Sequence, residues 1–178
     1  HLPLVVPPVV VGYALLVSFG SQGAIGAFLA EHVGLTFAFR WTGAALASAI
    51  MGFPLMVRAI RLSIEQVDRR LEQAAATLGA SPWRVFRTVT LPLAWPGVVA
   101  GAVLGFAKAL GEFGATITFV SAIPGETLTI ASAVYGLMQV PGGEAAIWRL
   151  AAVSLALSFG ALLLSDWLVR RQRGNPAD

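Results

Sequence analysis

The chain has 178 residues, of which 57% are hydrophobic and only 12% are charged, and its formal net charge is +3. Soluble domains carry about 25% charged residues, so this chain cannot cover a globule with solvated side chains, and its apolar residues must face lipid. The absence of cysteine excludes disulfides, thiolate metal sites and thiol catalysis. The two histidines, His1 and His32, lie too far apart for a histidine metal cluster. The modest basic balance is better explained by membrane topology than by nucleic-acid binding.

Four segments are apolar and long enough to cross a membrane, which takes about 20 residues. The four predicted spans are residues 2–19, 41–60, 97–120 and 147–169. Pro7 and Pro8 lie in the first span, and we expect them to kink it because proline lacks an amide donor. Gly111 and Gly114 predict a break or kink in the third span. The chain begins without Met in an apolar stretch, so we expect an N-terminal truncation.

The placement of arginines predicts how the spans are oriented. Arginines crowd the link between the second and third spans and follow the fourth span. They are Arg58, Arg61, Arg69, Arg70, Arg84, Arg87, Arg170, Arg171 and Arg173. The positive-inside rule places this link and the C-terminus in the cytoplasm, and the loops 20–40 and 121–146 outside. Residues 125–140 predict a short helix at the outer surface, ended by a Pro-Gly-Gly turn.

The cytoplasmic link, residues 62–95, differs from the rest of the chain. Apolar residues recur at helical spacing from Ile64 to Leu78, with charged residues between them, which predicts one amphipathic helix. Three consecutive alanines give this helix a face that another protein can approach closely. Gly79 follows the last apolar residue and favours a left-handed C-terminal cap.

A second short helix is predicted directly after this cap. Ser81 and Pro82 fit an N-cap followed by a first-turn proline, and we expect the helix to stop before Pro92. Trp83 and Phe86 would be costly on a link that only joins two spans, so they favour docking of a cytoplasmic partner over a purely solvated loop. The link is therefore predicted to be a helix, a tight glycine turn and a helix.

The stretch EQAAATLGASPWRVFRTVTLP, residues 72–92, resembles the EAA loop of ABC-importer permeases. The family form is Glu-Ala-Ala, three residues, Gly, nine residues, Ile, one residue and Leu-Pro. Gln73 stands where the family has Glu, Glu72 lies one residue earlier, and Val89 replaces Ile. Glu72 and Gln73 thus both stay candidates for the polar contact with the ATPase. The resemblance implies a coupling role for Glu72, Gln73, Ala74, Ala75, Gly79, Trp83, Arg84, Leu91 and Pro92.

Three further runs are similar to the permeases of molybdate ABC importers. They are LPLVVPPVVVGY at 2–13, LGEFGATITFVSAIPGET at 110–127 and PGGEAAIWRL at 141–150. Sulfate permeases share the LGEFGA portion and are less similar after it. The resemblance covers almost the whole chain. It implies an all-α, polytopic transmembrane bundle of the type I ABC-importer (MetI-like) class, forming one domain over residues 1–178 with about four spans and short cytoplasmic coupling helices. It also implies that one or two N-terminal spans are missing.

The resemblance further implies the partners and the location of the chain. It implies a homodimer in the cytoplasmic (inner) membrane, two cytoplasmic ATPase subunits that bind ATP and Mg²⁺, and an extracytoplasmic binding protein that delivers molybdate. Tungstate is a further candidate, and sulfate stays open. The chain lacks a GxxxxGK[ST] motif, so it is not the ATPase. We expect no cofactor in this chain and no catalytic site, because no nucleophile-and-base or metal constellation is present.

The transport pathway has candidates near the third span. Lys108 and Glu112 share a helix face, and either Lys108 attracts the oxyanion or the two form a neutralised structural pair, which is favoured because Glu112 cancels most of the field. Neutral donors at a helix break also suit an anion. The candidates are Pro7, Pro8, Lys108, Gly111, Glu112, Gly114, Thr116 and Thr118. An ion-coupled secondary transporter with a proton site at Lys108 and Glu112 is the alternative, but the EAA-type link argues against it.

Overall fold

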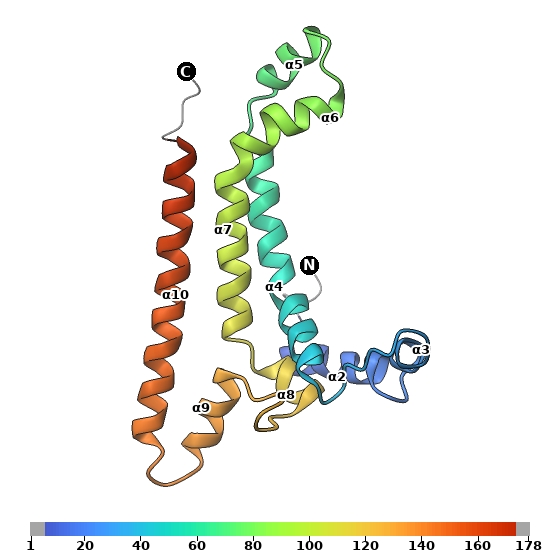
Figure 1. The fold of residues 1–178 in the computed structure, drawn as a ribbon, viewed down its shortest axis with the longest axis vertical. Helices are drawn as coiled ribbons and strands as arrows, with labels where there is room; N and C mark the ends of the chain where they lie inside the picture. Colours follow the sequence, from blue (N-terminus) through green and yellow to red (C-terminus); the bar gives the residue numbers. More distant parts are fainter. Residues whose placement is uncertain (1–5, 174–178) are drawn as a thin grey trace. The chain divides into compact units, whose positions relative to one another are not determined.

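The computed structural model describes residues 6–173, and all regular elements in this part of the chain are helices (Figure 1). In chain order they are α2 (Pro8–Phe19), α3 (Ala24–His32), α4 (Trp41–Glu65), α5 (Arg69–Thr77), α6 (Pro82–Val85), the π-helix η1 (Phe86–Thr90), α7 (Leu91–Leu110), α8 (Gly114–Val120), α9 (Ile130–Met138) and α10 (Glu144–Arg173). The all-α expectation is confirmed.

Three helical stretches are long and apolar enough to cross a membrane: Trp41–Glu65, Pro82–Leu110 and Glu144–Arg171. Helices α2 and α3 are joined by a bend of 49°, and they form a fourth candidate span only if the two are taken together as one bent span. The third predicted span, 97–120, is divided: its helix ends at Leu110, and residues 114–120 form the separate helix α8. The break between them lies where Gly111 and Gly114 predict it.

The expectation that Pro7 and Pro8 kink the first span is wrong. Pro7 is the N-cap of α2 and Pro8 is its first residue. A proline at this position costs little, because the amide that it lacks has no partner within the helix anyway. The bend comes later, after Phe19. Residues 2–5 of that predicted span lie outside the described residues.

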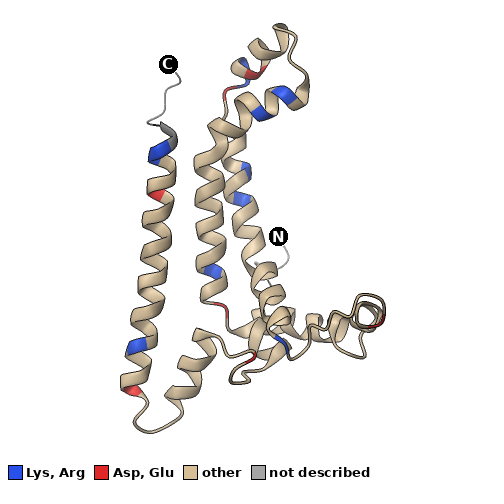
Figure 2. Ribbon diagram, in the orientation of Figure 1, with Lys and Arg blue, Asp and Glu red and all other residues tan. Residues whose placement is uncertain are grey.

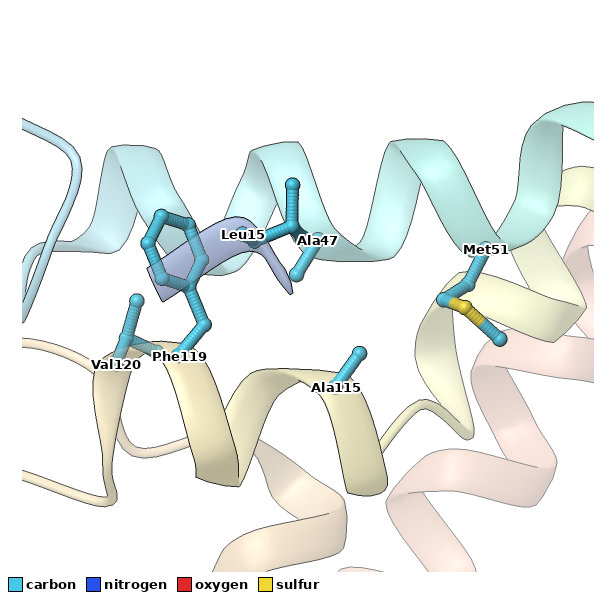
Figure 3. Close-up of a cluster of buried hydrophobic side chains, with 6 residues drawn as sticks. All are labelled: Leu15, Ala47, Met51, Ala115, Phe119 and Val120. Carbon is cyan, nitrogen blue, oxygen red and sulfur yellow. The ribbon is translucent and has the colours of Figure 1, made fainter. Parts of the chain in front are cut away.

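The chain divides into two compact units, which are described separately. The first comprises His1–Pro54 and Phe106–Ser158. Its buried apolar core joins side chains of α2, α4 and α8 (Figure 3). The core residues are Leu15, Ala47, Met51, Ala115, Phe119 and Val120. Small residues allow the close approach: a Cβ atom on Gly12 of α2 would lie 2.5 Å from the carbonyl oxygen of Ala115 in α8. Close packing of this kind is what holds helices together in lipid.

The helix predicted within 125–140 is present as α9. The Thr129 side chain accepts a hydrogen bond from the Ser132 amide, and the Ser132 hydroxyl accepts one from the Thr129 amide. This capping box satisfies two amides that a helix start leaves free. Gly142, with a φ of 83°, lies in the predicted turn after the helix.

The second unit comprises Leu55–Gly105 and Phe159–Asp178. In it the end of α4 packs against the start of α7, where the Ser63 hydroxyl donates to the Ala94 carbonyl over 3.1 Å. Gly97 faces Ser63 so closely that no side chain fits between them. The short helices α5 and α6 connect these two helices (Figure 1).

Two boundaries in the link differ from the prediction. The single amphipathic helix is instead two, because α4 continues to Glu65 and α5 starts only at Arg69. Asp68 is the N-cap residue of α5: its carboxylate accepts a hydrogen bond from the Arg70 amide over 2.9 Å. The second helix does not stop before Pro92 but continues through η1 into α7. Pro92 fits because it directly follows the wider π-helical turn, in which the Leu91 amide bonds to Phe86.

Helix α10 has no buried residue in its apolar stretch. Figure 2 shows that its charges lie near its two ends. Glu144 and Arg149 lie in the first two turns, and Asp166 and Arg170 lie 3.6 Å apart near the other end. The long middle part of this helix carries no charge and has exposed apolar sides, so it is suited to lipid or to another apolar helix.

Candidate coupling surface and the junction of α7 and α8

The turn between α5 and α6 has the predicted geometry. Gly79 adopts a φ of 84°, and the Ala80 amide bonds to the Ala75 carbonyl over 3.2 Å, which is the pairing of a glycine-ended helix. The Ser81 side chain then accepts from the Arg84 amide, and Pro82 opens α6. These local capping interactions explain why the chain turns sharply at this point.

The surface around this turn is exposed and partly apolar. Leu78 is 88% exposed, and Trp83 is 66% exposed with its ring stacked on Phe86 at a centroid distance of 5.6 Å. Most of the predicted coupling residues are exposed as well. They are Gln73, Ala74, Gly79, Trp83, Arg84 and Pro92, whereas Glu72, Ala75 and Leu91 are half-buried. Large exposed apolar side chains next to charged ones mark surfaces that meet other proteins.

The two candidates for the polar contact, Glu72 and Gln73, have different surroundings in the structure. The Glu72 carboxylate accepts a hydrogen bond from the Thr90 hydroxyl over 2.6 Å, so it is engaged within the chain. Gln73 projects from an exposed position of the same helix. Thr90, which is 5% exposed, was not singled out by the sequence, since no motif connects it with Glu72, 18 residues away.

Lys108 and Glu112 form a close pair at the junction of α7 and α8. The Lys108 ammonium lies 2.9 Å from one carboxylate oxygen of Glu112, and the Ala115 amide donates to the other oxygen over 2.9 Å. The Glu112 side chain is 1% exposed and that of Lys108 is 32% exposed. The carboxylate is therefore paired on both oxygens and satisfies an amide in the first turn of α8. Lys108 and Glu112 thus neutralise each other in this structure.

The predicted threonine donors of α8 are used inside the helix. The Thr116 hydroxyl donates to the Phe113 carbonyl over 2.9 Å, and the Thr118 hydroxyl donates to the Gly114 carbonyl over 2.8 Å. Gly114 lies against Pro8 of α2, where an added Cβ would be 2.8 Å from the proline Cβ. Glu112 and Thr116 are buried, Gly114 and Thr118 are half-buried, and Pro8 and Gly111 are exposed.

Thr127 is a second buried polar residue that the sequence did not single out. Its hydroxyl accepts from the Ile123 amide over 2.9 Å and lies 3.2 Å from the Val120 and Ser121 carbonyls. It fixes the loop that follows α8. Within residues 6–173, no three His, Asp or Glu side chains gather as metal ligands would.

Comparison with known proteins now defines the class. Residues 1–174 match the family described as binding-protein-dependent transport system inner membrane component. The chain belongs to this family of membrane permease components. The inner-membrane, multi-pass location follows from the family and from the apolar helices.

Individual relatives carry more specific names. The chain is 64% identical over 173 residues to the molybdenum transport system permease protein ModB of Escherichia coli K12, covering 97% of this chain and 76% of the relative. It is 60% identical to the ModB protein of Haemophilus influenzae, covering all of this chain and 80% of the relative. A probable sulfate transport system permease protein, cysT of Chlorella vulgaris, is 33% identical over 97% of this chain and 64% of its own length.

Proposed function

We propose that this chain is the permease subunit of an ATP-driven importer that moves molybdate, and tungstate as a close analogue, into the cytoplasm. In this proposal a second copy completes the membrane channel, and an extracytoplasmic binding protein delivers the ion. Two separate ATPase subunits bind ATP and Mg²⁺ and dock on the link 62–95, with the C-terminus on the same side. The high identity to two molybdenum permeases carries the choice of ion. The 33% identity to a sulfate permease favours sulfate less.

The exposed unit of α5, Gly79 and α6 supports the docking part of the proposal. It offers Leu78 and Trp83 to a partner. Helix α5 follows the spanning helix α4, and α6 is the first turn of the stretch Pro82–Leu110, so a push on this unit acts directly on the membrane part. Movement of packed rigid helices between two arrangements is a common way to transmit such a push.

The pathway is proposed to pass the junction of α7 and α8. The threonine hydroxyls bond within α8, and the Gly111 amide donates to the Ala107 carbonyl over 3.2 Å. The group left for an ion is therefore the partly exposed ammonium of Lys108. Glu112 cancels most of that positive charge, so the ion would be held only weakly.

The test is uptake of labelled molybdate by vesicles that contain the permease, its ATPase and its binding protein. We expect uptake only with ATP and the binding protein, and none with a catalytically inactive ATPase. Uptake driven by a pH gradient without ATP would instead favour the secondary transporter that uses Lys108 and Glu112. Competition by tungstate and by sulfate would rank the three anions.

Gly79→Pro should abolish binding of the ATPase while the permease still inserts into the membrane. Proline is restricted to a φ near −65° and cannot adopt the 84° of Gly79, so the turn that presents α5 and α6 will be lost. The measurement is co-purification of the ATPase with the tagged permease. The matched control is Gly34→Pro, which meets a similar φ of 71° with nothing within 4 Å, in a predicted outer loop. Equal ATPase binding by Gly79→Pro and the wild type would contradict the docking proposal.

A further inference from the structure

The hydrogen bond between Glu72 and Thr90 connects two elements that the chain separates by 18 residues. Glu72 lies in α5, and Thr90 is the last residue of η1, directly before α7. The acceptor is a carboxylate, the distance is 2.6 Å, and Thr90 is 5% exposed. Hydrogen bonds to charged acceptors are stronger than neutral ones, and shielding from water strengthens them further.

The covalent connection between α5 and α6 is held by hydrogen bonds within the turn, with little side-chain packing at its tip. It runs through Gly79, which has a φ of 84° and nothing within 4 Å of the position that a Cβ would take. Leu78, beside it, is 88% exposed. The tip of the turn therefore offers little side-chain packing that could transmit a displacement of α5, whereas α5 also contacts η1 directly.

The element that donates this hydrogen bond, η1, is itself unusual. Residues Phe86–Thr90 form a π-helix, and the Leu91 amide bonds to the Phe86 carbonyl instead of to an atom four residues back. Such π-helical turns often lie at functional sites, and helices change direction at them. Thr90 lies at the end of this turn, where the regular helix α7 begins.

We propose that the Glu72–Thr90 hydrogen bond is the strut that transmits movement of α5 into the cytoplasmic end of α7. Glu72 and Thr90 are then positioning residues for transport, and the neighbouring Gln73 is left to face the partner. This inference rests on the proposed function for its transport readout. The positioning itself is testable on the permease alone.

The first test measures hydrogen exchange of the α5 amides in the permease in lipid nanodiscs. Thr90→Val keeps the side-chain shape and removes the hydroxyl, and we expect exchange in Arg69–Thr77 to become about tenfold faster as local opening becomes easier. Thr90→Ser keeps the hydroxyl and should exchange as the wild type does. Thr88→Val is the matched control, because the Thr88 hydroxyl donates only within its own helix, to the Arg84 carbonyl. Unchanged α5 exchange in Thr90→Val would overturn the inference.

The second test measures molybdate ions imported per ATP hydrolysed by the assembled importer. For Thr90→Val we expect ATPase binding and hydrolysis to persist while the ratio falls about fivefold, as coupling contacts of this kind allow. Glu72→Ala should behave in the same way, and the double variant should be no worse than either, since both remove one contact. Gln73→Ala should weaken ATPase binding instead. Additive losses, or a normal ratio in both single variants, would overturn the inference. Failure of the wild type to import molybdate with ATP would contradict the proposed function, and the exchange result would still decide on the strut.

Discussion

Lys108→Met will destabilise the permease by about 3 kcal/mol, the lower end of the cost of removing one partner from a buried ion pair, because Glu112 is buried while Lys108 is 32% exposed. The variant leaves the Glu112 carboxylate, 1% exposed, with only the Ala115 amide as a partner. Methionine keeps the length of the side chain, so the loss reports the charge and not the packing. The measurement is thermal unfolding of the purified permease in detergent.

The chain offers a matched control for this pair. Arg61 and Glu65 have the same spacing of four residues and lie 2.7 Å apart, but their side chains are 75% and 54% exposed. Arg61→Met should change the unfolding temperature little, because exposed pairs are solvated and screened. The double variant of Lys108→Met with Glu112→Gln should recover most of the loss, since glutamine keeps an acceptor for the Ala115 amide. Similar unfolding of Lys108→Met and Arg61→Met would show that the pair at the junction is not structural.

Gly12→Ala is the second substitution with a large expected effect. The new methyl group would lie 2.5 Å from the Ala115 carbonyl oxygen and 2.9 Å from its Cα, both of them backbone atoms that no rotamer change can move. Helix α2 must then shift away from α8, and we expect a loss of about 3 kcal/mol, at the upper end of the usual cost of overpacking. Thermal unfolding of the detergent-solubilised permease gives the measurement.

Gly136→Ala makes the same chemical change where there is room for it. Gly136 lies inside α9 with nothing within 4 Å of the added Cβ. Alanine is the better helix former by about 1 kcal/mol, so this variant should be as stable as the wild type or more stable. If both glycine variants shifted the unfolding temperature equally, the close contact of α2 with α8 would not limit stability.

Local features of the sequence predicted the link well where the cause of the structure is itself local. Gly79, Ser81 and Pro82 set the turn through their own backbone preferences and caps, and the structure has each of them in the expected place. The same holds for the break at residues 111–113. Asp68 was overlooked, and its cap at the start of α5 divides what the apolar spacing presents as one helix.

The prolines show where sequence rules need tertiary or neighbouring context. Pro8 sits at a helix start and Pro92 follows a π-helical turn, and in both places the missing amide costs little. Contacts at the candidate site likewise depend on the fold and could not be predicted from local sequence. The EAA-type spacing predicted a coupling segment, but only the fold brings Thr90 to Glu72, and only the fold places the Ala115 amide on the Glu112 carboxylate.

The carboxylate of Glu112 has a kinetic consequence for the anion transport that we propose. Backbone amides at the start of a helix attract negative charge, and an oxyanion that bound there would dwell before it moved on. Glu112 already accepts from the Ala115 amide, and Lys108 balances its charge. On the proposed pathway, an oxyanion at this junction would therefore bind only weakly, and weak binding is what rapid release requires.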